Sequence, residues 1–143
     1  MKKLFVILCL FCISDTILSQ EWSTDFESSK QKAKEEEKKT LLVFMGSDWC
    51  SHCIRLDKKV WQTEIFNSYA EKKLVLVKAD FPRKNSNKLS PKQIEQNNKL
   101  ASMYNPKGSF PLVVIFDSQG KLLGKINNSK TSPEDFIELL NTF

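Results

Sequence analysis

Apolar residues along the chain fall into short uninterrupted runs that are separated by longer amphipathic segments. Leu41–Met45 and Leu74–Ala79 have the length of strands and lack the alternation expected of a strand with one wet face. They predict two parallel strands that are covered on both faces. Phe110–Phe116 and Lys121–Ile126 flank the polar turn Asp117–Gly120, and this pattern predicts an antiparallel hairpin.

The amphipathic segments between these runs predict helices. A stripe formed by Trp22, Phe26 and Ala33 predicts a first helix from Gln20 to about Lys39, and a second helix is expected from Cys50 to about Val60. Capping residues mark the starts of three further helices, at Thr63, Ser90 and Ser132. The residues expected to face the core from the third and fourth helices include Ile65, Phe66, Ile94 and Leu100.

Length and composition indicate one globular α/β domain. With 143 residues the chain can build a single core, and it has neither an internal repeat nor a domain-splitting linker. The predicted order is strand, helix, strand, helix, strand, strand, helix, with an extra helix at the N-terminus. The formal net charge is +5, but the lysines form no basic stripe interleaved with aromatic residues, so no nucleic-acid partner is expected.

The first 19 residues have the pattern of a secretory signal peptide. Lys2 and Lys3 precede the apolar run Leu4–Ile13, and small and polar residues follow it up to Ser19. The apolar run is too short for a stable transmembrane span, so we expect no stable membrane insertion after cleavage. We therefore expect an exported domain of residues 20–143 that is periplasmic or secreted. We also expect this domain to be a monomer.

The cysteines narrow the chemistry further. Cys9 and Cys12 lie in the predicted signal peptide, which leaves Cys50 and Cys53 in a single Cys-x-x-Cys motif. Residues 46–48 supply turn and N-cap chemistry, so Cys50 is expected in the first helical turn, where free N–H groups and the helix dipole favour a thiolate. Cys53 follows one turn later on the same face. The alternative, a structural disulfide, would close so small a loop that it would stabilise the fold little.

Zinc binding is the main chemical alternative, because Cys50, His52 and Cys53 are all ligand types. Structural zinc needs four ligands, and the chain has one histidine and no second cysteine pair, so a zinc site would require a dimer. We expect no metal. The four glycines form no dinucleotide-binding loop, and we expect no cofactor beyond a redox-active Cys50–Cys53 disulfide.

A strand, then Trp49-Cys50-Ser51-His52-Cys53, then a helix resembles the thioredoxin superfamily. The longer run from Phe44 to Cys50 is similar to secreted bacterial thioredoxin-like proteins, the thiol–disulfide interchange type, and the resemblance extends from about Trp22 to the C-terminus. It implies the thioredoxin fold, with a central mixed four-stranded sheet flanked by helices. It also implies that Cys50 is the nucleophile and that Cys53 resolves the mixed disulfide.

The same resemblance implies roles for residues around the pair. Ser51 and His52, which separate the cysteines, would tune the redox potential; a partly cationic imidazole would stabilise the thiolate and favour the reduced form. Trp49, Phe110 and Pro111 would dock the substrate, and Pro111 would follow a cis peptide bond. The alternatives are an incidental surface histidine and an ordinary trans turn proline.

Two residues of this chain depart from the thioredoxin pattern, and one of them replaces a proton acceptor. Phe44 stands where thioredoxin has a buried aspartate that accepts a proton, and Lys58 replaces the proline that kinks the helix. Lys78 matches a family lysine beneath the site, provided that the strand register holds. Asp48 lies closer in sequence but in a turn that we expect to be exposed. Lys78 and Asp48 are the remaining candidates for proton handling.

These observations predict a thiol–disulfide oxidoreductase of the protein-disulfide reductase or oxidase type. Its partners would be the thiols and disulfides of other proteins, together with a redox partner protein that supplies or removes electrons. The alternative is a non-catalytic binding or chaperone-like module that has kept the fold, and Phe44 is the residue that favours it.

Overall fold

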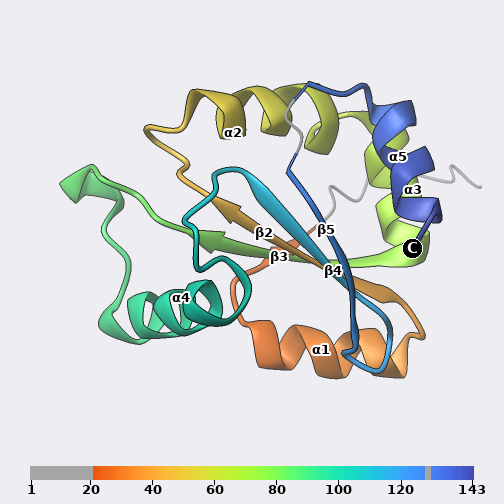
Figure 1. The fold of residues 1–143 in the computed structure, drawn as a ribbon, viewed down its shortest axis with the longest axis horizontal. Coiled ribbons are helices and arrows are strands. Elements are labelled where there is room, and N and C mark those ends of the chain that lie inside the picture. The colour runs from red at the N-terminus through yellow and green to blue at the C-terminus, as the bar shows by residue number, and fades with distance from the viewer. Residues whose placement is uncertain (1–20, 128–129) are drawn as a thin grey trace, which may run out of the picture.

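The computed structural model describes residues 21–127 and 130–143, so the predicted signal peptide lies outside the described residues. Within these ranges the strands form one mixed five-stranded sheet in the order β1-β3-β2-β4-β5 (Figure 1). The strands are β1 (Trp22–Ser23), β2 (Lys39–Met45), β3 (Leu74–Asp80), β4 (Leu112–Phe116) and β5 (Leu122–Ile126). β1 and β2 both pair in parallel with β3, whereas β4 pairs antiparallel with β2 and with β5. The predicted α/β fold class, parallel pair and hairpin are confirmed.

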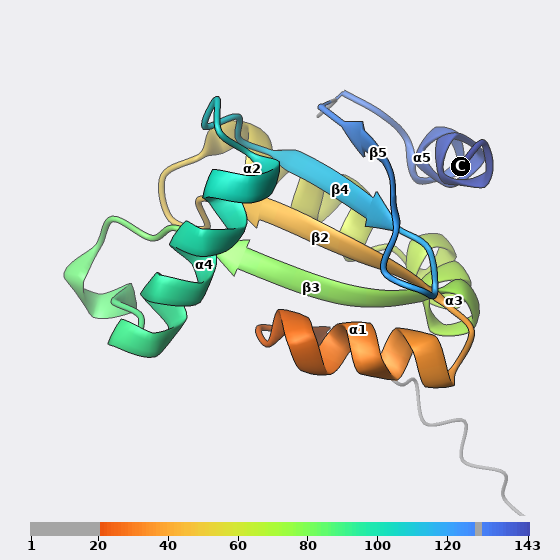
Figure 2. The same cartoon turned by 60° about the horizontal axis from the view of Figure 1, so that its bottom comes forward.

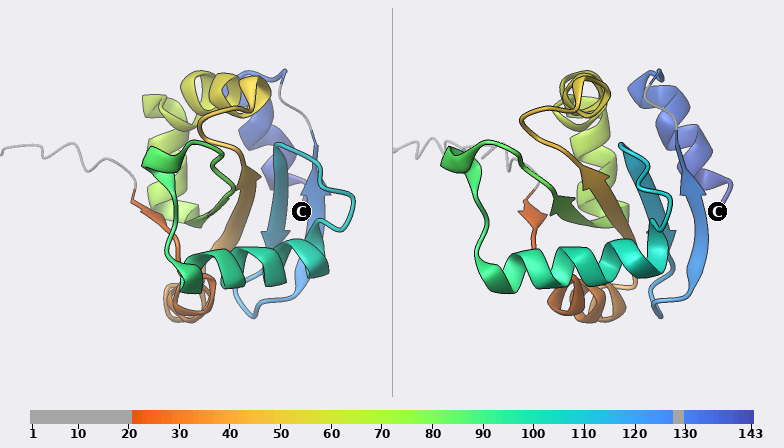
Figure 3. Two further views of the ribbon diagram at one scale, coloured as in Figure 1. Left: turned by 90° about the vertical axis from the view of Figure 1, so that its left-hand side faces the viewer. Right: turned by 60° about the vertical axis from the view of Figure 1, so that its left-hand side comes forward.

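Helices cover both faces of this sheet. They are α1 (Phe26–Glu35), α2 (Ser51–Leu56), α3 (Glu64–Lys73), α4 (Pro91–Tyr104) and α5 (Pro133–Asn141), with a π-helical turn η1 (Asp57–Trp61) and a 3-10 turn η2 (Asn85–Asn87). α2, α3 and α5 lie on one face, and α1 and α4 lie on the other (Figures 2 and 3). No helix in the described part of the chain is long and apolar enough to cross a membrane.

Apolar residues fill the space on each side of the sheet. On the side of α2, α3 and α5, the Trp61 ring makes edge-to-face contacts with Phe66 and Phe136, with centroids 4.8 and 4.9 Å apart. On the side of α1 and α4, Phe26 packs against Phe116. Because both faces of β2 and β3 are covered, their sequences read as nearly continuous apolar runs.

The predicted capping residues begin the helices at which they were placed. Thr63, Ser90 and Ser132 each accept a hydrogen bond from the backbone N–H of the third residue further along the chain. A side-chain oxygen in this position satisfies one of the N–H groups that the first helical turn leaves unpaired. These local signals fixed the starts of α3, α4 and α5.

The predicted N-terminal helix is wrong at both ends, and the predicted sheet lacks one strand. Residue 20 lies outside the described residues, and Trp22 belongs to a short strand that pairs with Leu76 of β3. Asp25 then caps α1, and Glu37, with a φ of 53°, lies beyond its end. The apolar spacing of Trp22 fitted a helical stripe by coincidence, because an edge strand also buries it against the core.

Two predicted core residues are on the surface instead. Ile65 of α3 and Ile94 of α4 are 49% and 39% exposed. α4 buries Leu100 and the polar Asn97, whose Nδ2 donates a hydrogen bond of 2.8 Å to the carbonyl oxygen of Asp80. A buried amide at that position rotates the helix so that Ile94 faces outward.

The first prediction concerns the aromatic packing under α5. Replacing Phe136, which is fully buried, with alanine removes its contacts with Trp61 and should lower the free energy of unfolding by about 3–5 kcal/mol. The exposed Ile65 provides the control, since Ile65→Ala should change stability by less than about 0.5 kcal/mol. Urea denaturation measures both, and losses of equal size would contradict this packing arrangement.

Candidate active site

Cys50 lies where the carboxyl end of β2 meets the first turn of α2. β2 ends at Met45, and a short turn, residues 46–49, leads to Cys50, which is the N-cap of the helix. The Cys50 Sγ accepts a hydrogen bond of 3.2 Å from the backbone N–H of Cys53. That N–H has no partner within the helix, so the sulfur takes the place of a capping oxygen. A thiolate at Cys50 would be stabilised by the same donor.

The two cysteines are joined by a disulfide, with Cα atoms 5.2 Å apart. Both are buried, and Cys50 is the more accessible, at 5% against 2% for Cys53. Cys53, the predicted resolving thiol, is thus the more buried of the two. Ser51 and His52, between them, are exposed in the first turn of α2.

Trp49 stands beside the disulfide and is held from several sides. Its Nε1 donates a hydrogen bond of 2.7 Å to the carbonyl oxygen of Phe81, and its ring meets Phe110 edge-on with centroids 5.5 Å apart. A Cβ atom at Gly46 would overlap the indole, so glycine there leaves room for it. Trp49 and Phe110 both pack against the apolar cluster that contains Cys50 and Cys53.

The peptide bond between Phe110 and Pro111 is cis, as predicted. Phe110 is half-buried and contacts Phe81 as well as Trp49, with ring centroids 5.5 Å apart in each pair. The structure therefore brings the predicted docking residues Trp49 and Phe110 together and places Pro111 at the start of the segment that leads into β4.

A cationic side chain that the sequence prediction missed completes this aromatic cluster. The guanidinium carbon of Arg83 lies 3.8 Å from the centroid of the Trp49 ring, a cation–π contact. Arg83 and Phe81 belong to the segment between β3 and α4, residues 81–90, called here the β3–α4 loop. The parallel pairing of β2 and β3 could have identified Arg83 as a neighbour of Trp49. Met45 lies opposite Asp80, so the segments that follow the two strands emerge at the same edge of the sheet.

Asp48 fastens the β3–α4 loop to the turn before Cys50. Its carboxylate accepts hydrogen bonds from the backbone N–H groups of Arg83 and Lys84, at 2.9 and 3.0 Å, and from Asn87 Nδ2 at 2.9 Å. These donors, Arg83 first, hold the pKa of Asp48 below its ordinary value. The geometry gives Asp48 an anchoring role, and its predicted part in proton handling stays a prediction.

Asp80 makes the reciprocal connection. Its carboxylate accepts hydrogen bonds from the backbone N–H and the hydroxyl of Ser47, at 2.8 and 2.5 Å. Asp48 of the turn therefore binds the β3–α4 loop, and Asp80, at the end of β3, binds the turn. The turn and the loop are fixed relative to each other by charge-assisted hydrogen bonds, which are stronger than neutral ones.

Lys78 points to the face of the sheet that carries α2, as the register argument required. Its Nζ lies 3.8 Å from Asp57 Oδ1 and 4.7 Å from the centroid of the Trp22 ring. Asp57, four residues after Cys53 on the helical path, is a second residue that the sequence prediction missed. Its spacing from Cys53, one helical turn, was the signal that could have identified it.

The two departures from the thioredoxin pattern have structural explanations. Phe44 lies on the opposite face from the cysteines, where it stacks on Phe81, and the β2 residues that face the pair are the equally apolar Val43 and Met45. Lys58 falls in η1, so the helix departs from α-helical geometry there through a π-turn without a proline. Within the described ranges, no group of three or more His, Cys, Asp or Glu side chains is placed to hold a metal ion.

Comparison with known proteins agrees with this geometry. The disulfide bond reductase DsbH of Chlamydia pneumoniae is 32% identical over 106 residues, which are 74% of this chain and 61% of that protein. The thioredoxin-related protein DsbJ of the same bacterium is 34% identical over 68 residues, which are 48% of this chain and 19% of DsbJ. The chain thus spans less than two thirds of the length of either relative.

A solved structure and a family match also place this chain among thioredoxin-like proteins. A structure described as DsbH oxidoreductase superposes with a TM-score of 0.78 at 27% identity, over 87% of this chain and 83% of that one. The thioredoxin-like family matches residues 21–118, which include β1 to β4 and the cysteine pair. The chain therefore belongs to the thioredoxin-like family of the thioredoxin superfamily.

Proposed function

We propose that this protein is a thiol–disulfide oxidoreductase that exchanges disulfides with other proteins through Cys50 and Cys53. The observation that carries the proposal is the Cys50–Cys53 disulfide at the start of α2. The sulfur of Cys50, the more exposed residue of the two, accepts a hydrogen bond from the Cys53 N–H, and Trp49 and Phe110 pack beside the pair. The resemblance to DsbH, which is described as a disulfide bond reductase, favours reduction of the substrate as the direction.

In the reducing direction, the Cys50 thiolate attacks one sulfur of a substrate disulfide. The substrate S–S bond breaks, a mixed disulfide forms, and one substrate thiolate leaves. The Cys53 thiolate then attacks the Cys50 sulfur, which closes the Cys50–Cys53 disulfide and releases the second substrate thiolate. Two electrons have passed to the substrate, whose thiolates take up protons from solvent. A redox partner protein must return two electrons to the pair.

The surrounding residues have supporting roles in this proposal. Trp49, Phe110 and Pro111 form the rim on which the substrate chain docks. His52 and Ser51 adjust how strongly the Cys50 thiolate is stabilised. Lys78 is the candidate for proton handling, because its positive charge would favour the thiolate form of the buried Cys53. It lies on the face of the sheet beneath α2, where it pairs with Asp57.

We also propose that the protein acts as an exported monomer, in the periplasm or outside the cell, after removal of residues 1–19. Stable protein disulfides, the substrates proposed here, form and persist in oxidising compartments, and the N-terminal sequence has the pattern of an export signal. No cofactor other than the cysteine pair is required by the reaction.

The second prediction separates an enzyme from a binding module that has kept the fold. Cys50→Ser should reduce the rate of insulin-disulfide reduction to that of dithiothreitol alone, because the nucleophile is lost. Cys53→Ser should form a mixed disulfide with insulin that persists on non-reducing gels, because nothing resolves it. Wild type and Cys50→Ser acting at equal rates would refute the catalytic proposal.

The third prediction tests the tuning role of His52. His52→Ala should make the pair more reducing by roughly 30 mV, equivalent to about 1.4 kcal/mol, because the thiolate loses an imidazole that can carry positive charge. Ser51→Ala, which removes a side chain that carries no charge from the same exposed turn, should shift the potential by less. Equilibration with glutathione followed by tryptophan fluorescence measures both, and an unchanged or raised potential in His52→Ala would rule out the tuning role.

A further inference from the structure

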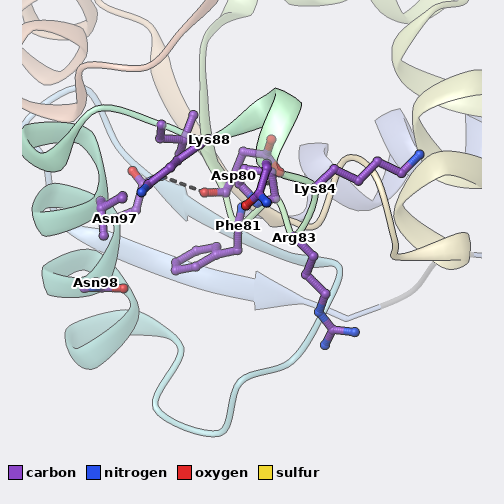
Figure 4. A pocket seen from close by; sticks show the side chains of 11 residues that line it. Asp80, Phe81, Arg83, Lys84, Lys88, Asn97 and Asn98 are labelled. Atoms are coloured by element: carbon purple, nitrogen blue, oxygen red, sulfur yellow. Dashed lines mark hydrogen bonds between the residues drawn. The ribbon is translucent and has the colours of Figure 1, made fainter.

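The β3–α4 loop presents a surface next to Trp49 that the exchange chemistry itself does not use. A cavity of about 320 Å³ lies between this loop and the start of α4 (Figure 4). Its apolar lining comes from Phe81, Pro82, Leu89 and Ile94. Ile94 is 39% exposed although it is a large aliphatic residue. The volume is at the small end of the range for binding pockets, with room for a side chain.

The charge on this surface is positive. Arg83, Lys84 and Lys88 line the same cavity and are all exposed. Among the described residues that line it, Asp80 is the acid, and its carboxylate already accepts hydrogen bonds from Ser47. Three cations therefore face solvent around an apolar cavity. In Figure 4, the Arg83 and Lys84 side chains extend away from α4.

This surface is fixed to the active site. Asp48 accepts hydrogen bonds from the backbone of Arg83 and Lys84, and Arg83 stacks on Trp49 at 3.8 Å. The far side of the cavity is also held, because Asn97 of α4 donates to the carbonyl oxygen of Asp80. A protein segment docked on Trp49 would therefore lie close to this loop.

We propose that the cavity and its three cations select protein substrates in which an acidic residue and an apolar residue flank the target cysteine. The positive charge of Arg83, Lys84 and Lys88 would attract the carboxylate to this surface, and the apolar side chain would enter the cavity beside Ile94. This inference rests on the proposed function, of which it specifies the substrate class. Because the cations are exposed, they act mainly by accelerating encounter, and their effect weakens as salt rises.

The fourth prediction uses three synthetic peptide disulfides that differ only in the residues beside the cysteine: Glu-Leu, Gln-Leu and Lys-Leu. The fully reduced protein is mixed with each peptide, and its oxidation is followed by stopped-flow tryptophan fluorescence. The second-order rate constant should be at least about threefold higher for Glu-Leu than for Gln-Leu at low salt, and lowest for Lys-Leu. This advantage should decline as the salt concentration is raised.

Variants that remove lysine charges test whether the preference for Glu-Leu comes from the β3–α4 loop. Lys84→Gln combined with Lys88→Gln should bring the Glu-Leu to Gln-Leu ratio close to one. Lys72→Gln combined with Lys73→Gln removes the same charge from the end of α3, which leads into the start of β3, and should keep the ratio. A fourth peptide, Glu-Gly, tests the cavity independently of charge. The wild type should react faster with Glu-Leu than with Glu-Gly, and Ile94→Ala should remove this preference.

The outcomes distinguish this inference from the function on which it rests. Equal rates with all three peptides would overturn the substrate preference and leave the exchange activity in place. A ratio that falls in the α3 control as much as in the loop variant would also overturn it, because net charge would then account for the effect. Failure of the reduced protein to react with any peptide would overturn the proposed function and the inference with it.

Discussion

The parallel pairing of β2 with β3 is the constraint on which the rest of the site depends. Both strands are buried on both faces, and their register places Met45 beside Asp80, so the segments that follow them emerge together at one edge of the sheet. One segment carries Cys50 to the start of α2, and the other carries Phe81 and Arg83 to Trp49. Asp48 and Asp80 then fix the two segments to each other.

The site combines an apolar base with a polar first helical turn. Val43 and Met45 face the cysteine pair from β2, which disfavours charge on the buried Cys53. At Cys50, the Cys53 N–H and the start of the helix act in the opposite direction and favour a thiolate. This difference in surroundings supports the proposal that Cys50 is the attacking thiolate and Cys53 the resolving one. Asp57 and Lys78 form an ion pair on the same face.

Local signals in the sequence were sufficient for most of the fold. The apolar runs identified β2, β3 and the hairpin, and Thr63, Ser90 and Ser132 marked the helix starts. What failed depended on partners distant in sequence. The strand at Trp22 exists because Leu76 offers it an edge, and Ile94 is exposed because Asn97 bonds to the end of β3. Likewise, Cys50 and the cis bond at Pro111 were predicted, whereas Arg83 and Asp57 required the strand register and the helix path.

The reduction potential of the Cys50–Cys53 pair tests the central claim most directly. A pair that exchanges disulfides with other proteins should equilibrate with glutathione or dithiothreitol between about −270 and −120 mV, the range of thioredoxin-like exchange proteins. A structural disulfide would stay oxidised to potentials below about −300 mV. A value in that lower range, or two cysteines that never form an intramolecular bond, would contradict the account.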